Sequence, residues 1–420
     1  MSTTQSTSQS SEDLQLLQGG QAYFPALIQA IDTAVAWVQF ETYIFDIHGM
    51  GADVAGALVR AARRGVTVQV LVDGIGSDAL PPQWQQKMQD SGVQWCVYSP
   101  LGTGLGGLGV LMPDHWRRLH RKLCVVDQRI VFCGGINVLD DLYDPNHGDL
   151  KAPRFDFAVA VTGPLAVEAA DAVALVWWRV QAGYSARQRH LSAAWEKFKA
   201  AGYGGRTRAT PLTTPPADNA ANAAPGVMPR TRAALVLRDN FRNRSSIEKA
   251  YLKAIGKSHG EILIANAYFV PGGKLRRALT GAARRGVKVT LLLQGKYEYF
   301  MQYHAARPVY DALLKAGIEI HEYEASFLHA KVAVIDGHWA TVGSSNLDPL
   351  SLLLAREANV VIEDRVFAQQ LREQLCEAIA SCGSRIDPAS HSRRPLGQRL
   401  LGHLAHTLMR LAIWITGQRY

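Results

Sequence analysis

The chain has 420 residues, 48% of them hydrophobic, and a formal net charge of +9. This length and apolar content exclude a disordered chain and a single small domain, and they suit two domains of ordinary size. The excess of positive charge predicts attraction to a polyanion, whether nucleic acid, an anionic lipid headgroup or a phosphorylated substrate.

The first domain is expected over residues 14–201. Residues 1–13 precede it and lack the basic and apolar regions of a signal peptide, so they are predicted to be a disordered tail. Within the domain, a β-rich run at residues 37–45 leads into a helical pattern at residues 52–64, which stops at a glycine before a further strand. Strand, helix and strand in this order predict a βαβ unit and a largely parallel sheet.

The second domain, expected over residues 232–384, repeats the plan of the first. The run AARRGVTV at residues 61–68 returns as AARRGVKV at residues 282–289, again after a strand and a helix. Residues 202–231, between the domains, are rich in Pro, Gly, Ala, Asn and Thr and are predicted to be a linker or exposed loop. Two tandem copies of one α/β domain explain this order better than two unrelated domains.

The C-terminal segment, residues 385–420, carries six arginines against one aspartate. Leucines at helical spacing oppose a polar stripe in it, which predicts a basic amphipathic helix that either lies on a membrane surface or packs on the protein. No uninterrupted apolar run reaches the roughly 20 residues of a membrane-spanning helix, so membrane contact is expected to be peripheral. The apolar stripe is Leu400, Leu401, Leu404, Leu408, Leu411 and Ile415, and the polar one is Arg399, His403, His406 and Arg410.

The signature H-x-K-x4-D occurs once in each half, each time with an asparagine ten positions past the aspartate. The copies are His120, Lys122, Asp127 and Asn137, then His329, Lys331, Asp336 and Asn346. Each histidine and lysine lie two positions apart on a β-rich run and should project from one strand face. The aspartate falls at a hairpin turn, so antiparallel strands join the parallel ones and the sheets are expected to be mixed.

These residue types suit phosphoryl transfer on a phosphodiester. A neutral, oriented histidine can attack phosphorus to give a phosphohistidine, while a second histidine protonates the leaving alkoxide and later deprotonates the incoming alcohol. The lysines and asparagines would surround the phosphorus and stabilise its developing charge. No metal or cofactor is required, and neither a ligand cluster nor a C-x-x-C pair among the five cysteines predicts one.

Each histidine needs a carboxylate that fixes its tautomer. Asp156 follows His120 by 36 residues and Glu357 follows His329 by 28, each at the start of an apolar strand. We expect each carboxylate to orient the histidine that precedes it.

Together these residues resemble the signatures of the phospholipase D superfamily. More narrowly, ANAYFVPG at residues 265–272 and HWATVGSSNLDPLS at residues 338–351 are similar to bacterial cardiolipin synthases. The chain lacks the N-terminal membrane-spanning segments of the longer type, so it resembles the cardiolipin synthase B type more closely, over residues 14–364.

The resemblance implies two phospholipase D-like domains that share one cleft about a pseudo-twofold axis. It implies that one phosphatidylglycerol gives its phosphatidyl group to a histidine with loss of glycerol, and that a second accepts the group to form cardiolipin. His120 would be the nucleophile and His329 the general acid and base. The expected partners are phosphatidylglycerol and an anionic membrane surface, and the expected location is peripheral, on the cytoplasmic side of the cell membrane.

Two other functions remain open from the residues. One is a phosphodiesterase that hydrolyses phospholipid or nucleic acid, and the other is a non-catalytic protein that binds anionic lipid. The positive charge is concentrated in the C-terminal segment rather than along the segments that would form the cleft, so no nucleic-acid partner is expected.

Overall fold

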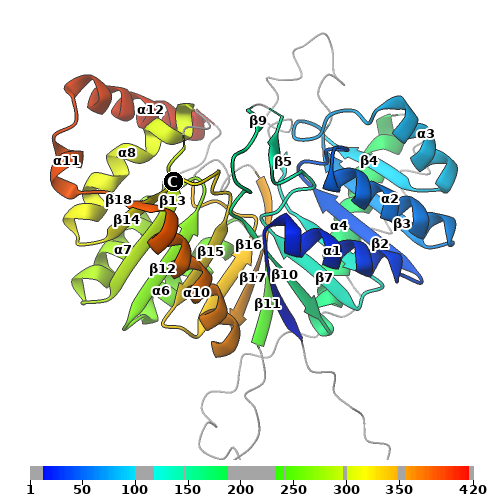
Figure 1. The fold of residues 1–420 in the computed structure, drawn as a ribbon, viewed down its shortest axis with the longest axis horizontal. Helices are drawn as coiled ribbons and strands as arrows, with labels where there is room; N and C mark the ends of the chain where they lie inside the picture. Colours follow the sequence, from blue (N-terminus) through cyan, green and yellow to red (C-terminus); the bar gives the residue numbers. More distant parts are fainter. Residues whose placement is uncertain are drawn as a thin grey trace, which may run out of the picture.

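The computed structural model describes residues 13–99, 118–145, 147–187, 232–239, 243–296, 300–348 and 355–415. Residues 1–12 and the linker expected at residues 202–231 lie outside this part. The described chain forms two α/β halves whose sheets meet in the middle of the molecule, with most helices on the outer sides (Figure 1). This confirms the expected duplicated fold with mixed sheets.

The first half contains a seven-stranded sheet. Its parallel part is β2, β3 and β4, connected through α2 and α3, whereas the strands on the other side of β2 run antiparallel. The predicted βαβ unit is therefore present, but the sheet as a whole is less parallel than expected because a hairpin follows the signature. The order of strands is β1 (Leu14–Gln18), β10 (Phe157–Thr162), β7 (Ile130–Gly134), β6 (Leu123–Val126), β2 (Trp37–Thr42), β3 (Thr67–Asp73) and β4 (Gln94–Tyr98), with helices α1 (Gly19–Asp32), α2 (Met50–Arg63), α3 (Pro82–Ser91) and α4 (Pro164–Arg187).

The second half repeats this order in a nine-stranded sheet, to which the short strand β5 (Arg118–Leu119) of the first half also belongs. The order is β11 (Arg232–Arg238), β17 (Ala355–Glu363), β16 (Trp339–Gly343), β15 (Lys331–Ile335), β12 (Glu261–Asn266), β13 (Lys288–Gln294), β14 (Glu319–Tyr323) and β18 (Gly383–Arg385). The helices are α6 (Ser246–Lys257), α7 (Gly273–Arg284), α8 (Phe300–Lys315), α10 (Arg365–Cys382), α11 (Pro388–Ser392) and α12 (Leu396–Ile415).

One apolar core joins the two halves. It contains Val131 and Val159 from the first sheet and Val342 and Val360 from the second, all of them buried. Each half also has a core of its own under its outer helices. Burial of apolar surface between the sheets therefore fixes one half against the other, which a site built from both halves requires.

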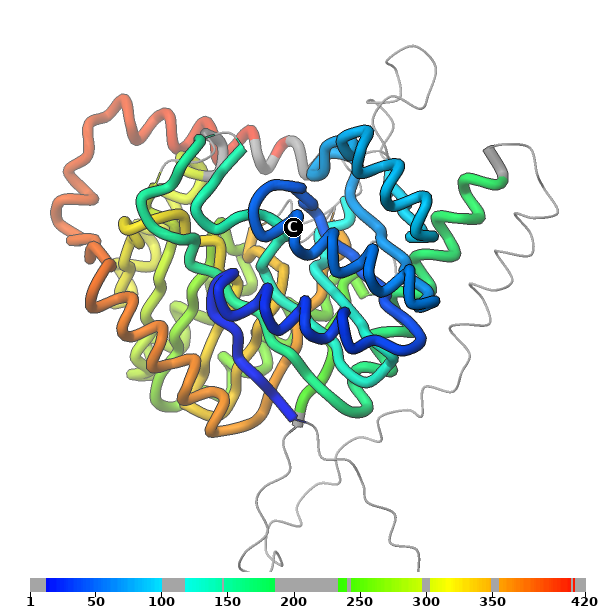
Figure 2. The backbone as a smooth tube through the Cα atoms, turned by 45° about the vertical axis from the view of Figure 1, so that its right-hand side comes forward, coloured from blue at the N-terminus to red at the C-terminus, as the bar shows by residue number. Residues whose placement is uncertain are grey.

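The helix α12 packs along α8 at one end of the second half (Figure 2). Gly402 and Ala405 face α8, and the Nδ1 atom of His406 lies 3.2 Å from the carbonyl oxygen of Ala305. His406, which the sequence places on the polar stripe, thus lies against α8, where a face of small residues lets the two helices approach closely. No helix in the described part of the chain is long and apolar enough to cross a bilayer.

Candidate active site

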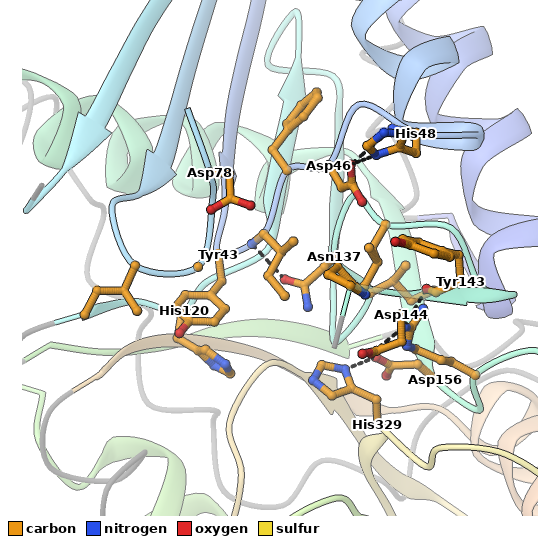
Figure 3. A pocket seen from close by; sticks show the side chains of 18 of the residues that line it. Tyr43, Asp46, His48, Asp78, His120, Asn137, Tyr143, Asp144, Asp156 and His329 are labelled. Atoms are coloured by element: carbon orange, nitrogen blue, oxygen red, sulfur yellow. Dashed lines mark hydrogen bonds and ion pairs between the residues drawn. The ribbon is translucent and has the colours of Figure 1, made fainter. Parts of the chain in front are cut away.

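His120 and His329 line one cavity of about 890 Å³ between the halves. Both imidazoles lie at its floor, with Asn137, Tyr43 and Asp156 beside them (Figure 3). Their side chains are 16% and 18% exposed, so the cavity reaches rings that are otherwise enclosed by protein. The structure thus brings together the two histidines that the sequence placed 209 positions apart.

His120 is positioned by a strand of the other half. β5 pairs in parallel with the start of β17, and the backbone N–H of His120 donates to the carbonyl oxygen of Arg356 at 3.0 Å. The next residue on β17 is Glu357, whose carboxylate oxygens lie 3.0 and 3.1 Å from the Nδ1 atom of His120. Because Nδ1 faces the carboxylate, Nε2 is the ring nitrogen that is left to act on a substrate.

His329 is positioned in the corresponding way by the first half. A parallel bridge joins Phe155 to Leu328, and the backbone N–H of His329 donates to the carbonyl oxygen of Phe155 at 2.9 Å. The next residue is Asp156, whose Oδ2 lies 2.6 Å from the Nδ1 atom of His329. Asp156 and Glu357 thus lie where they can orient the imidazoles, but the expected pairing within each half is wrong: each carboxylate contacts the histidine of the opposite half.

Lys122 and Lys331 are buried beside the histidines. The ammonium of each donates to the backbone carbonyl oxygen of its own histidine, at 2.9 Å for Lys122. The ammonium of Lys122 also lies 5.3 Å from the centre of the Tyr43 ring, which in turn is 4.9 Å from the ring of His120. Two ammonium groups next to the imidazoles suit a phosphate, because charges on buried groups are screened little by solvent.

Burial dominates the electrostatics of this site. It lowers the pKa of His120, against the opposing effect of Glu357, and together with Lys331 and Lys122 it lowers the pKa of His329 well below the usual range. Burial also lowers the pKa of Lys122 to about 7 and raises the pKa of Asp156 to about 7, in spite of nearby Lys331. Burial therefore favours the uncharged ring of His120, whereas the Asp156–His329 pair holds a proton below about pH 7 and loses it as the pH rises through that value.

The two asparagines occupy corresponding positions at the cavity wall. Asn137 accepts a hydrogen bond from the backbone N–H of Ile44 through Oδ1, at 3.2 Å. Asn346 is 2% exposed, and its Oδ1 has no hydrogen-bond partner among the described residues. Both amides are placed where they can contact a bound substrate.

The departures between the two signatures have a structural reason. In the second half, the hydroxyl of Ser344 donates to Glu357 at 2.5 Å. In the first half, Gly135 occupies the corresponding position, and a Cβ there would lie 2.2 Å from Oδ1 of Asp156. The shorter aspartate thus requires a glycine beside it, whereas the longer glutamate leaves room for a serine.

Asp127 and Asp336 lie outside the cavity, at the far end of the strands that begin near the histidines. Each carboxylate accepts hydrogen bonds from three consecutive backbone N–H groups, from residues 35–37 for Asp127 and from residues 259–261 for Asp336. They connect a hairpin turn to the start of β2 or β12. The catalytic role expected for these two residues does not fit this position, and a structural role does.

Sequence reasoning missed most of the cavity wall. Asp46 and His48 follow β2, and Tyr143 and Asp144 come from the hairpin of β8 (Tyr143–Asp144) and β9 (Gly148–Asp149). None of them belongs to a repeated motif, so only their position after a strand or in an insertion of the first half could have singled them out. In the described part of the chain, no group of three or more His, Cys, Asp or Glu side chains is arranged to hold a metal ion.

Known proteins share the sequence and the fold of this chain. The family described as "Cardiolipin synthase, PLD-like domain" matches residues 27–147 and 251–379. Cardiolipin synthase B of Escherichia coli (strain K12) and cardiolipin synthase B of Salmonella typhimurium are each 36% identical over 392 residues, which covers 91% of this chain and 84% of theirs. The crystal structure of phosphatidylserine synthase from Haemophilus influenzae has the same fold, with a TM-score of 0.65 at 14% identity over 95% of this chain and 94% of that one.

Proposed function

Because the chain belongs to the cardiolipin synthase family of phospholipase D-like proteins, we propose that it is a phosphatidyltransferase that makes cardiolipin from two molecules of phosphatidylglycerol. The observation that carries this proposal is the pair of histidines in one cavity, each held by a carboxylate of the opposite half. Two oriented imidazoles on one phosphodiester are what a double displacement through a covalent intermediate needs.

In the first step, Nε2 of His120 attacks the phosphorus of phosphatidylglycerol. A neutral ring with Nδ1 bound to Glu357 presents its free electron pair at Nε2, so this histidine suits the nucleophile. The phosphorus–oxygen bond to the headgroup breaks, and the Asp156–His329 pair gives its proton to the glycerol oxygen as it leaves.

In the second step, His329 takes the proton from a hydroxyl of a second phosphatidylglycerol. The resulting oxygen attacks the phosphohistidine, cardiolipin forms and His120 is released. Lys122 and Lys331 stabilise the negative charge on the phosphorus oxygens in both steps. The reaction releases one glycerol for each cardiolipin and needs no outside reductant or oxidant.

A lipid substrate requires contact with a bilayer, and we infer that α12 provides it. Five leucines on this helix are 46–73% exposed, although its opposite face packs on α8: Leu396, Leu400, Leu404, Leu408 and Leu411. Exposure of this leucine row to water is unfavourable by about 25 cal/mol per Å² of apolar surface. Burial of the row in a membrane interface would remove this cost. Arg399 and His403 are exposed beside the row, where they complement anionic headgroups.

The position of α12 suits a membrane-bound enzyme. Figures 1 and 2 both place it at the end of the molecule where the β8–β9 hairpin lies, and this hairpin supplies residues of the cavity. A bilayer that receives the leucine row would therefore lie near the entrance to the site. This position supports a protein that is bound peripherally to the membrane.

Membrane attachment can be tested separately from chemistry. Leu400→Glu with Leu404→Glu should reduce sedimentation with phosphatidylglycerol-containing vesicles at least tenfold and leave activity in detergent micelles within about twofold. Val366→Glu is the matched control, because this valine is 78% exposed on α10 and should not affect binding. If the double variant sedimented like the unaltered protein, the leucine row would not be the membrane contact.

The activity is tested with purified protein and phosphatidylglycerol in mixed micelles, followed by lipid chromatography. Equal amounts of cardiolipin and free glycerol support the proposal, phosphatidic acid alone indicates hydrolysis, and unchanged lipid indicates a binding protein. A phosphatidyl p-nitrophenyl ester then separates the roles of the histidines, because its leaving group needs no acid. His329→Ala should still release a burst of p-nitrophenol, whereas His120→Ala should not.

A further inference from the structure

The cavity is strongly asymmetric although the fold is duplicated. Apart from Tyr268, His329, Asn346, Asp348 and Ala355, all the residues that line it belong to the first half. It continues from the histidines to the loop after β2, where Asp46 and His48 lie, and Tyr143 of the β8–β9 hairpin lies on the same side (Figure 3). The transfer steps above leave this part of the cavity without a role.

The side chains in this part can exchange hydrogen bonds with a ligand. Oδ1 of Asp46 accepts from the backbone N–H of His48 at 3.2 Å and lies 2.5 Å from Nδ1 of the same residue. No described residue donates to the other carboxylate oxygen, Oδ2. The His48 ring lies 6.3 Å from the Tyr143 ring, so the three residues form one group with acceptors and donors.

The loop that carries Asp46 is fixed by close packing. The backbone N–H of Asp46 donates to the carbonyl oxygen of Val138 at 2.8 Å, and a Cβ at Gly51 would lie only 1.8 Å from the carbonyl oxygen of Asp46. Gly49 has a φ of 52°, in the region that favours glycine. The carboxylate of Asp46 is therefore held in place before any ligand arrives, as a recognition group should be.

The charge of the cavity wall identifies the kind of group that fits. Arg154 is paired with Asp144 at 2.8 Å and Arg118 with Asp73 at 3.2 Å, so both cations already have acidic partners. Asp46, Asp78 and Asp141 add negative charge to the same wall. Hydroxyl groups that donate hydrogen bonds to these carboxylates are therefore favoured there. The unpaired Oδ1 of buried Asn346 in the same cavity also requires a donor.

We propose that Asp46, His48 and Tyr143 form a polyol site that holds the glycerol headgroup of phosphatidylglycerol. The proposal rests on the proposed function and names the part of the cavity that selects the alcohol. Asp46 accepts hydrogen bonds from the glycerol hydroxyls, and His48 and Tyr143 supply the remaining hydrogen-bond partners of these hydroxyls. The leaving glycerol occupies the site in the first step, and the headgroup of the accepting lipid occupies it in the second.

The polyol site lies on the side of His329. The ring of His147, on the β8–β9 hairpin, is 5.0 Å from the ring of Phe327, two residues before His329. Tyr143 is drawn above the His329–Asp156 pair, on the far side from His120 (Figure 3). Because an in-line displacement puts the leaving oxygen opposite the nucleophile, an alcohol held on this side receives its proton from His329 and leaves His120 to attack.

The test measures which alcohol the enzyme selects. The phosphatidyl p-nitrophenyl ester serves as donor, with glycerol and 1-propanol competing as acceptors, and the ratio of the two products is measured. Loss of one hydrogen bond to a charged group corresponds to about tenfold, so Asp46→Asn should lower the glycerol-to-propanol ratio by about that factor, and Asp46→Glu should restore part of it. A ratio does not depend on how much of a variant is folded.

Asp53→Asn is the matched control, because Asp53 is exposed on α2 and does not line the cavity. Its ratio should equal that of the unaltered enzyme. An unchanged ratio in Asp46→Asn would overturn the polyol site, as would a preference of the unaltered enzyme for ethanolamine over glycerol. Hydrolysis without transfer to any alcohol would instead overturn the proposed transferase, so the two failures are distinguishable.

Discussion

Replacing Gly135 by alanine is predicted to disable the Asp156–His329 pair. The added Cβ would lie 2.2 Å from Oδ1 and 2.8 Å from Cγ of Asp156, whereas carbon and oxygen atoms normally stay more than about 3.2 Å apart. The carboxylate must therefore move by about 1 Å. The distance between Oδ2 of Asp156 and Nδ1 of His329 is 2.6 Å. After this movement it would exceed the length of a hydrogen bond.

The expected loss follows from the sensitivity of catalysis to position. A displacement of about 1 Å costs on the order of 100-fold in rate, which corresponds to about 2.7 kcal/mol of transition-state stabilisation. Crowding of a buried site also costs about 1–3 kcal/mol of unfolding free energy. We therefore expect Gly135→Ala to fold with reduced stability and to lose roughly 100-fold in kcat.

The assay is the conversion of phosphatidylglycerol in mixed micelles, with thermal unfolding followed by circular dichroism. Gly256→Ala is the control, because Gly256 is exposed on α6 with open space around it and should keep full activity. If Gly135→Ala kept kcat within about threefold of the unaltered enzyme, the position of Asp156 would not control the reaction.

Three further outcomes are expected. Asp127→Ala should lower the free energy of unfolding by about 1–2 kcal/mol in urea titrations, since three backbone N–H groups lose their acceptor. It should keep kcat within about threefold of the unaltered enzyme. A loss of kcat as large as that of His120→Ala would restore a catalytic role for Asp127. Gln128→Gly should raise the free energy of unfolding by about 1 kcal/mol, because Gln128 has a φ of 55° in a turn where the second half has glycine. An unchanged free energy of unfolding would show that the turn is unstrained. The ratio kcat/KM should fall as pH rises above about 7, because Asp156 loses its proton and Lys122 its charge in that range; a flat profile up to about pH 9 would contradict these pKa shifts.

The repeated signature by itself determined the duplicated fold and indicated the candidate reacting groups. Local chemistry is sufficient for this, because the alternation of a β-rich run predicts that His120 and Lys122 share one face. The hairpin turns were also visible locally: Asp336 and Gly337 have φ values of 51° and 62°, the left-handed conformations that this dipeptide favours. The apolar runs of the strands similarly indicated the buried sheets.

Only the tertiary structure decided which carboxylate serves which histidine. Asp156 and Glu357 are each closer in sequence to one histidine and in space to the other, because β5 pairs with β17 and Phe155 pairs with Leu328 across the halves. No spacing within one half contains that information.

The same holds for the faces of α12 and for the cavity wall. A helical pattern shows which side chains share a face, but only packing against α8 determines that the small residues turn inward and the leucine row outward. Asp46 and His48 lie in a loop without a repeated motif, and the fold alone brings them into the cavity of His329. Local sequence thus determines conformation and chemistry, whereas contacts between distant segments determine which groups meet, because those contacts depend on how two whole halves bury their apolar surfaces against each other.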